Sequence, residues 1–331
     1  MHLPKKPVIF FLTIVVVITC SSWGYLVHKT SMQLAVYKLP KAIQPFFYKN
    51  MDYLVENAGR PDKRRNTDST EAPKHFIDLE KFGENAAYKM PFKWDDAVSK
   101  YSLDTLKTYG YVPYEIMFMK QQLTAAFKTG NADSILFYAT DMGHYIGDAN
   151  VPLHTTENYD GQLTDQVGIH SLWETMIPEI EISNFNLYDK HKATYLAKPA
   201  ERIWKAIRKA NALVPEMLAA EKMVTLQFTP DKKYRTQIRR GKEVKYYTSD
   251  FAKAYSKALG NTVNEQLLST SDMIADFWYT AWVDAGKPAL DIALSEDEAA
   301  AIQTEKEFFK KNQLIENNLL RSQKEVPKKE E

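Results

Sequence analysis

The sequence predicts one large all-α domain with a small β-hairpin inserted near residues 225–248. Apolar residues recur at a spacing close to 3.6 residues along most of the chain, and alternating polar and apolar stretches are scarce. Hydrophobic residues make up 44% of the chain and aromatic residues 12%, which is enough for a core and argues against wholesale disorder.

The charges nearly balance, with 43 Lys and Arg against 42 Asp and Glu and a formal net charge of +1. No global field therefore draws the protein to nucleic acid or to an anionic membrane. Any such contact must come from a local patch of charge.

The first 22 residues have the features of an export signal. A basic head is followed by the apolar run "VIFFLTIVVVIT", and the small residues Cys20 and Ser22 stand just before Trp23. We expect cleavage before Trp23 and a secreted or periplasmic protein. An uncleaved membrane anchor and a lipid anchor at Cys20 are the alternatives. Because Cys20 is the only cysteine, the mature chain has no disulfide and depends on packing or metal for stability.

The helices can be placed in order from their apolar spacing and their end signals. Gly130 and Asn131 end one helix, and Asp133 or Ser134 caps the next. The residues between about 60 and 74 form a polar loop. The predicted helices cover residues 29–38, 43–58, 94–109, 114–129, 134–148 and 170–176, a long helix from Pro199 with a kink at Pro215, then 250–286 and a charged helix over 294–323.

Residues 225–248 break the helical pattern, because turn signals at Pro230-Asp231 and Arg240-Gly241 are flanked by strand-like residues. Residues 231–246 carry seven Lys and Arg against two acids. This hairpin could contact a phosphate backbone, anionic headgroups or only solvent. The predicted domain organisation is a signal peptide at 1–22, one domain at 23–290 and a charged helix with a disordered tail at 291–331.

Three of the seven histidines fall between residues 144 and 170, in "HYIGDANVPLH" and "HSLWE". His144 and Asp148 are four residues apart, as are His170 and Glu174, and such positions share one face of a helix. Imidazole and carboxylate groups together are typical zinc ligands, and similar helical pairs build di-iron sites. A single histidine is more often a core residue, but matched pairs in a histidine-poor chain favour a metal site.

These motifs resemble those of the family that unites bacterial zinc-dependent phospholipase C with the single-strand-specific zinc nucleases. Four blocks occur in the family's order: "WGYLVH" from Trp23, "HFID" from His75, then "HYIGDANVPLH" and "HSLWE". The resemblance covers about residues 23–180. It implies an all-α fold, three zinc ions and hydrolysis of phosphodiester bonds.

The resemblance also implies a ligand set. Asp68 lies in the same loop as Asp62 and is the alternative ligand there. The expected ligands are Asp62, His75, His144 and Asp148 for one zinc, His154, His170 and Glu174 for a second, and for the third the α-amino nitrogen and carbonyl oxygen of Trp23, His28 and the second oxygen of Asp148.

In this arrangement the chemistry is carried by zinc and two carboxylates. Zinc ions lower the pKa of a bound water to ~7, and the resulting hydroxide attacks phosphorus in line. The expected catalytic residues are Asp148, as the bridging ligand, and Asp62, which orients the water or accepts its proton. Asp78 and Asp141 are either partners that orient the imidazoles or surface acids.

The substrate signals are mixed. The "HSLWE" spacing and "HTTENY" resemble the phospholipases, whereas the five-residue step from Trp23 to His28 resembles the nucleases. A nuclease also needs aromatic side chains that stack on unpaired bases. The candidates for stacking are Phe76, Tyr145, Tyr159 and Trp173.

We therefore expect a phospholipase C-like zinc hydrolase that acts on a phosphodiester substrate. A single-strand-specific nuclease or nucleotidase is the first alternative, and an exported zinc-binding protein without catalysis is the second. The expected partners are a phospholipid headgroup or a single-stranded nucleic acid, with peripheral contact to a membrane surface. No stable protein partner is expected.

Overall fold

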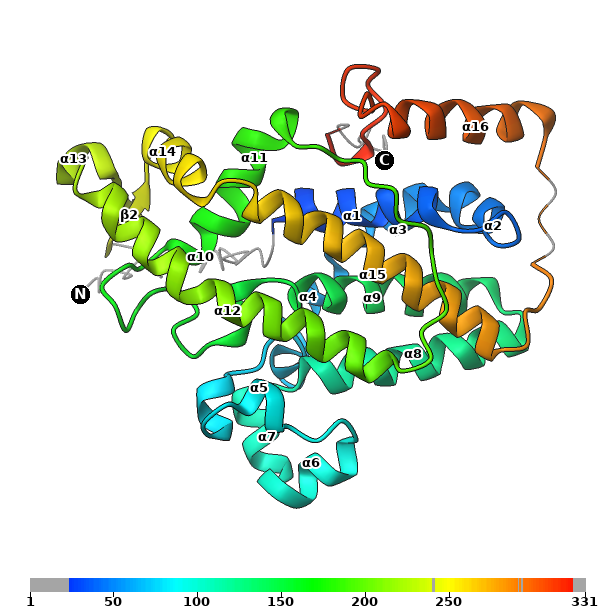
Figure 1. Cartoon of the computed structure of the whole chain (residues 1–331), viewed down its shortest axis with the longest axis horizontal. Coiled ribbons are helices and arrows are strands. Elements are labelled where there is room, and N and C mark those ends of the chain that lie inside the picture. The colour runs from blue at the N-terminus through cyan, green and yellow to red at the C-terminus, as the bar shows by residue number, and fades with distance from the viewer. Residues whose placement is uncertain (1–23, 240–241, 291, 293, 324–331) are drawn as a thin grey trace, which may run out of the picture.

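The computed structural model describes residues 24–239, 242–290, 292 and 294–323. Five long helices dominate it, and four of them, α1, α8, α9 and α15, pack on one another (Figure 1). The long helices are α1 (Tyr25–Lys38), α8 (Val112–Thr129), α9 (Ala132–Asp148), α12 (Pro199–Thr225) and α15 (Thr262–Asp284). The predicted all-α class is confirmed.

The remaining elements surround these helices. They are α2 (Gln44–Lys49), α3 (Met51–Glu56), α4 (Arg60–Arg64), η1 (Ala72–Lys74), η2 (Leu79–Phe82), α5 (Ala86–Lys89), α6 (Trp94–Tyr101), α7 (Leu103–Tyr109), η3 (Pro152–Thr155), α10 (Ile169–Ser171), η4 (Leu172–Met176), α11 (Ile177–Glu181), η5 (Ile182–Asn184), α13 (Pro230–Lys233), α14 (Ser249–Leu259), α16 (Glu296–Lys310) and η6 (Arg321–Gln323).

The junction between α8 and α9 follows directly from the sequence. Gly130 ends α8 in a left-handed conformation with φ +68°, which glycine adopts without a steric cost. Asn131 is the N-cap of α9, and its side chain accepts a hydrogen bond from the backbone N–H of Ser134. The cap is thus Asn131 rather than Asp133 or Ser134.

Several predicted helices are shorter than expected, because local breaks interrupt the apolar pattern. The helix predicted over 94–109 divides at Ser102, which ends α6 at φ +72° and caps α7 by accepting from the N–H of Thr105. The helix predicted over 250–286 divides at Gly260 into α14 and α15. The helix predicted over 43–58 divides at Asn50.

Other differences lie in the predicted loop and near the end of the chain. The predicted polar loop contains the short helix α4. The helix predicted over 294–323 stops at Lys310. Pro215 stands within α12, which continues past it to Thr225.

The predicted hairpin is present. Its strands are β1 (Tyr234–Arg239) and β2 (Lys242–Tyr247), which pair antiparallel. Tyr234 lies opposite Tyr247 at the base, and Arg239 lies opposite Lys242 next to the turn.

A continuous apolar core links the long helices, and Phe47 stacks on Trp278 with ring centroids 4.5 Å apart. The segment after α16 covers α1, because Leu314 and Leu320 are buried and the Ser322 and Thr30 hydroxyls lie 2.8 Å apart. The domain division at residue 290 stays a prediction. Within the residues that the structure describes, no helix combines the length and hydropathy that a bilayer span requires.

Candidate metal centre

The first group of side chains lies on α9, on α4 and at His75, which directly follows η1. The Nδ1 atom of His75 lies 2.8 Å from Oδ2 of Asp148 and 3.2 Å from Nε2 of His144. Asp62 on α4 places its Oδ1 atom 3.6 Å from the His75 Nδ1 atom and 3.7 Å from the His144 Nε2 atom. All four side chains are buried. The fold therefore places His75 and Asp62, which lie 73 and 86 residues before Asp148 in the sequence, against one turn of α9.

A second group lies beside the first, on η3, α10 and η4. The Nε2 atoms of His154 and His170 are 3.3 Å apart, and Oε1 of Glu174 lies 3.0 Å from His170 Nε2. The Nδ1 atom of His154 is 3.7 Å from Oδ1 of Asp148, so the two groups adjoin. Glu174 stands in η4, a turn of π-helix, which the spacing did not predict.

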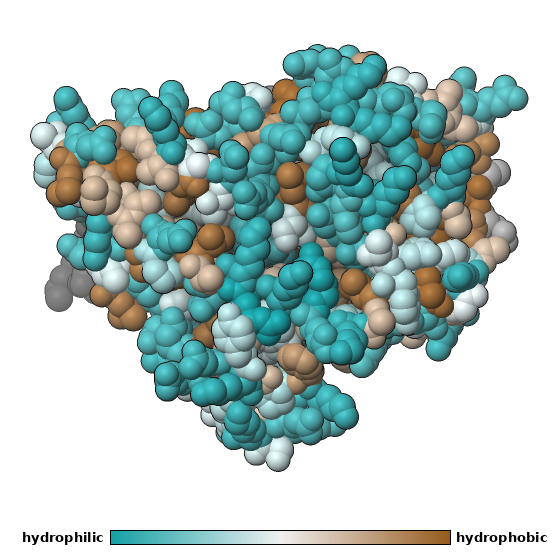
Figure 2. All heavy atoms as spheres, viewed as in Figure 1, coloured by the Kyte–Doolittle hydropathy of each residue, from teal (hydrophilic) through white to brown (hydrophobic). Residues whose placement is uncertain are grey.

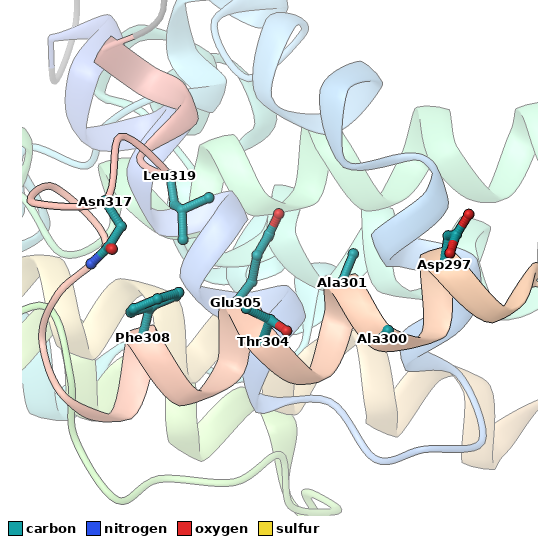
Figure 3. A pocket seen from close by; sticks show the side chains of 8 residues that line it. All are labelled: Asp297, Ala300, Ala301, Thr304, Glu305, Phe308, Asn317 and Leu319. Carbon is teal, nitrogen blue, oxygen red and sulfur yellow. The ribbon is translucent and has the colours of Figure 1, made fainter.

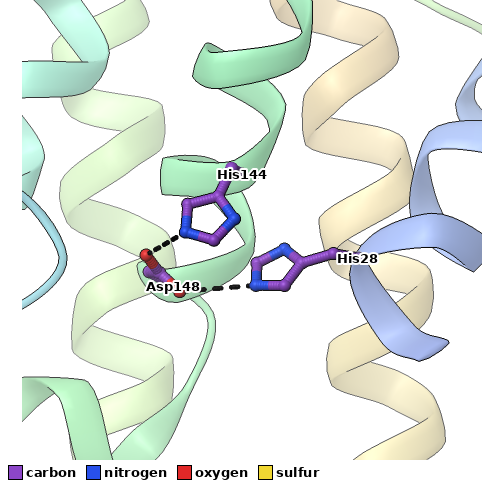
Figure 4. Close-up of side chains that lie close together, drawn as sticks. All are labelled: His28, His144 and Asp148. Carbon is purple, nitrogen blue, oxygen red and sulfur yellow. Dashed lines mark ion pairs between the residues drawn. The ribbon is translucent and has the colours of Figure 1, made fainter. Parts of the chain in front are cut away.

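His28 on α1 completes a third group with His144 and Asp148 (Figure 4). Its Nε2 atom lies 3.6 Å from Oδ1 of Asp148, and its ring stacks on His144 at 4.1 Å. This approach depends on Gly147, because a Cβ atom there would lie 2.7 Å from Cε1 of His28. The glycine in "HYIGD" thus makes room for a side chain from another helix.

Backbone carbonyls fix the hydrogen on three of these imidazoles. The Nδ1–H groups of His144, His154 and His170 donate to carbonyl oxygens at 2.8, 2.6 and 2.9 Å. Because a carbonyl oxygen can only accept, each Nδ1 carries the hydrogen and each neutral Nε2 keeps a lone pair. Those lone pairs face the carboxylates. The accepting carbonyls belong to Ala58, His75 and Tyr159.

When these three rings are neutral, their lone pairs therefore converge on buried carboxylates. Oδ1 of Asp62 and both carboxylate oxygens of Glu174 are buried and have no hydrogen-bond partner among the described residues, and the same is true of Nε2 of His28. Burying such atoms unsatisfied is costly, so this arrangement favours the binding of protons or metal cations between them. Ligands held by tetrahedral zinc at ~2.0–2.1 Å lie ~3.3 Å apart, close to the separations found here. The mixed nitrogen and oxygen donors fit zinc.

The pKa values express the same demand for positive charge. Burial lowers the pKa of His144, but the charges of Asp148 and Asp62 outweigh burial and raise it to about 9. Burial also lowers the pKa of His170, but Glu174 outweighs it and raises that pKa to about 9. Burial raises the pKa of Glu174, but His170 overcomes this effect and holds it below its usual range. Protons therefore bind tightly to His144 and His170, and a metal ion at the same place would compensate the same carboxylate charges.

Glu71 is a member of the site that sequence reasoning missed. Its Oε1 atom lies 3.5 Å from Nε2 of His75, on the side of the ring away from Asp148. The Glu71 carboxylate also pairs with Arg64 at 3.1 Å and Lys74 at 2.9 Å and accepts from the hydroxyl of Tyr145. The i,i+4 spacing of Glu71 and His75 was a signal that could have found it.

The two aspartates of the loop have different environments. Asp62 is 8% exposed and faces His75 and His144, whereas Asp68 is only partly buried and accepts hydrogen bonds from Thr70. The geometry thus favours Asp62 over Asp68 as a ligand.

The other predicted site residues lie as follows. Asp141 pairs with Arg60 and Arg64 rather than with an imidazole. Burial, with Glu80 and Glu157 nearby, raises the pKa of Asp78 to about 6. Trp23, the signal segment with Cys20, and the tail from residue 324 lie outside the described residues.

The candidate stacking aromatics are mostly unavailable to a base. Tyr145 and Trp173 are completely buried, Phe76 is partly buried, and Tyr159 is 56% exposed beside His170. Only Tyr159 therefore offers a largely free ring face.

A cavity of about 430 Å³ lies elsewhere, between α16 and the loop that follows it (Figure 3). Its lining includes Glu305, Phe308 and Leu319 but none of the clustered histidines and carboxylates. The candidate metal centre and this cavity are separate features.

No protein-family model matches the chain, and no curated protein matches it. Among solved structures, the alpha toxin from Clostridium absonum is similar, with a TM-score of 0.49 and 16% sequence identity. The match covers 78% of this chain and 64% of the toxin chain, which is less than two thirds of the toxin. A likeness at this level does not bear on activity.

Proposed function

We propose that the protein is an exported zinc-dependent hydrolase of phosphodiester bonds that acts on phospholipids in the manner of a phospholipase C. The observation that carries this proposal is the convergence of buried imidazole and carboxylate groups around Asp148, where Oδ1 of Asp62, Nε2 of His28 and both carboxylate oxygens of Glu174 have no hydrogen-bond partner among the described residues. Three adjoining groups of this kind suit a reaction in which negative charge develops on phosphate oxygens.

Three zinc ions are proposed. The proposed ligands are Asp62, His75, His144 and Asp148 for the first, His154, His170 and Glu174 for the second, and His28, Asp148 and the α-amino and carbonyl groups of Trp23 for the third. The third set requires cleavage before Trp23, because the amine is otherwise part of a peptide bond.

Zinc held there would supply a Lewis acid that polarises phosphodiester oxygens and favours the ionisation of water. Asp148 brings its two oxygens to different groups, since Oδ2 faces His75 and Oδ1 faces His28. Oδ1 of Asp62 faces His75 and His144 and would be its ligating atom, which leaves the other carboxylate oxygen to orient the attacking water or accept its proton. The carbonyls of Ala58 and Tyr159 hold the rings of His144 and His170 in place.

Phospholipid is favoured over nucleic acid by the scarcity of stacking surfaces at the centre. A nuclease that reads unpaired bases needs exposed aromatic rings, and burial removes Tyr145 and Trp173 from that role. The glutamate at position 174 also resembles the phospholipases more than the nucleases.

A substrate panel tests the proposal. The secreted protein is assayed on phosphatidylcholine, single-stranded DNA, RNA and bis(p-nitrophenyl) phosphate, with zinc content measured on the same sample. Asp148→Ala should lose zinc and hydrolysis together, because it removes the ligand that the first and third proposed zinc sets share. Asp68→Asn is the matched control and should keep both, because this acid lies in the neighbouring loop and bonds to Thr70 rather than to an imidazole.

The outcomes separate the alternatives. Hydrolysis of DNA or RNA without phospholipid cleavage would make the protein a nuclease. Stoichiometric zinc with no hydrolysis of any substrate would make it a zinc-binding protein. N-terminal sequencing adds an independent check: a mature protein that begins at Trp23 supports three zinc ions, whereas one that keeps residues before Trp23 contradicts the third.

A further inference from the structure

Positive charge is concentrated in one stretch of the chain. Residues 222–257 contain ten Lys and Arg against three Asp and Glu, a net of +7 in a chain whose formal net charge is +1. This stretch, called the basic end below, comprises the last turn of α12, α13, the hairpin and most of α14. It lies at one extremity of the molecule, at the left in Figure 1. An asymmetry of this size creates the local field that the balanced whole lacks.

The same extremity exposes aliphatic side chains. Six large non-aromatic hydrophobic side chains are exposed in the described residues, and one of them, Leu103, lies elsewhere, on α7. Figure 2 shows apolar residues among hydrophilic ones at this extremity. The other five lie on the basic end or on the adjoining loop: Leu163 (63% exposed), Val167 (58%), Met223 (63%), Leu226 (80%) and Ile238 (80%).

A buried glutamate holds these elements together as one surface. Glu221 on α12 accepts from the amide of Gln166 at 2.6 Å, from Lys233 at 2.7 Å and from the hydroxyl of Tyr247 at 3.0 Å. Gln166 belongs to the loop over residues 157–168, and Tyr247 ends the hairpin. The loop, α12 and the hairpin are therefore fixed relative to one another.

The loop also forms the rim of the candidate metal centre. The carbonyl of Tyr159 accepts from Nδ1 of His170, and Oδ1 of Asp160 accepts from the N–H groups of Gly168 and His170. The loop's acids are partly engaged, since Asp160 turns inward and Glu157 pairs with Lys81 on η2. Leu163 and Val167, which belong to this loop, are thus the exposed aliphatic residues next to the centre.

The residue types at this surface distinguish between two anionic partners. A single-stranded nucleic acid would need exposed aromatic rings for stacking, but the exposed side chains here are aliphatic except for Tyr159. Aliphatic side chains ringed by Lys and Arg are the composition that enters the boundary between headgroups and acyl chains. Basic residues near such a surface attract anionic lipids.

We propose that the basic end and the loop over residues 157–168 dock on the surface of an anionic phospholipid bilayer, which sets the rim of the candidate metal centre against the headgroups. The inference deepens the proposed function and rests on it, because a lipid hydrolase must bring its site to a substrate that stays in the membrane. Contact through side chains of both kinds makes binding dependent on anionic lipid and on salt.

Vesicle binding tests the proposal with two double variants of the full chain. Leu226→Ser with Ile238→Ser removes exposed aliphatic groups, and Arg235→Glu with Lys245→Glu reverses exposed charges. Vesicles of phosphatidylcholine and phosphatidylglycerol in a two-to-one ratio are sedimented on ice, before turnover. Each double variant should bind them about tenfold more weakly, or worse, than the parent. Added salt should weaken the parent but hardly change the charge-reversed variant.

Matched controls lie on α7 and α8. Leu103→Ser with Phe118→Ser, and Lys107→Glu with Lys128→Glu, make the same kinds of change at exposed positions away from the basic end. They should bind vesicles like the parent. All variants should hydrolyse the soluble diester bis(p-nitrophenyl) phosphate at the parental rate, which shows that they are folded and that the centre is intact.

The readouts separate this inference from the proposed function. Failure of the parent to bind the mixed vesicles, or undiminished binding by both double variants, would overturn the docking surface even if phospholipids in solution are cleaved. If the parent bound a single-stranded oligonucleotide but not the vesicles, and the double variants lost that oligonucleotide binding, the basic end would be assigned to nucleic acid. This result would also overturn the docking surface. Vesicle binding by the parent that both double variants weaken, without hydrolysis of any diester, would support docking and contradict the proposed function.

Discussion

Gly147→Ala is a small change with a calculable effect on the candidate metal centre. The added Cβ atom would stand 2.7 Å from Cε1 and 2.8 Å from Nδ1 of His28, whereas ordinary contact begins at 3.4 Å. The His28 ring must therefore retreat by the difference, about 0.6–0.7 Å. Metal ligation tolerates displacements of only ~0.2 Å, so the ring leaves ligating distance.

The effect on stability should be smaller than the effect on metal binding. Overpacking a filled interior costs ~1–3 kcal/mol, and replacing glycine by alanine within a helix returns ~0.5–1 kcal/mol. The folded protein should therefore persist while zinc at the third group, which contains His28, binds about tenfold more weakly or worse. Zinc stoichiometry and competition with a chromophoric chelator measure this directly.

Gly143→Ala is the matched control, one turn earlier on the same helix. Its Cβ atom would meet Cε of Met32 at 2.5 Å, which is the far end of a flexible side chain rather than an aromatic ring. The helix gains the same propensity in both variants. If Gly147→Ala binds as much zinc, and as tightly, as Gly143→Ala and the parent, the assignment of His28 to a metal group is wrong.

Three further predictions follow from the surroundings of the centre. Glu71→Gln should weaken zinc binding ~10–100-fold, because the carboxylate beside the ring of His75 is lost, and should lower the melting temperature by removing the ion pairs of Glu71 with Lys74 and Arg64. Unchanged zinc affinity in a competition assay would refute that role. Glu115→Gln should leave zinc affinity intact. Burial raises the pKa of Glu115 from 4.5 to about 7, so ionising this carboxyl group costs the folded state stability as pH rises between those values. Above pH ~7 the variant should therefore be more stable than the parent by up to ~3 kcal/mol, measured by urea unfolding. The melting temperature of the chelated protein should fall as pH rises from ~7 to ~9. In the folded state the pKa values of His144 and His170 are raised from 6.5 to about 9. The stability that their protonation gives is therefore complete below pH 6.5 and is lost above pH 9. Scanning fluorimetry across that range should show the fall; a flat profile would contradict it.

Much of the centre could be predicted because helical spacing is a local property. His144 with Asp148, and His170 with Glu174, share a face whatever else the chain does, and the structure brings both pairs together. The same rule applied to Glu71 and His75 would have found the remaining carboxylate. That pair spans a short 3₁₀ turn within a predicted loop, so no amphipathic helix drew attention to it.

The unpredicted features depend on tertiary contacts. Ser102 adopts a positive φ because two helices meet there, and serine carries no strong signal for that conformation. The π-helical turn at Glu174 is a change of winding that apolar periodicity does not report. Asp141 sits one turn before His144 like a candidate partner, but two arginines from α4 reach it first.

Because the group that contains His28 and the group that contains His75 both use His144 and Asp148, these two groups cannot fill independently. An ion that draws one oxygen of Asp148 fixes the carboxylate for its neighbour, and an ion that takes His144 removes a ligand that another group could use. By linkage, whatever the first ion does to the affinity of the second, the second does equally to the first. Occupancy of these two groups should therefore rise in a cooperative or a mutually exclusive sequence, and a zinc titration in which their two affinities are independent of one another would contradict the shared ligands.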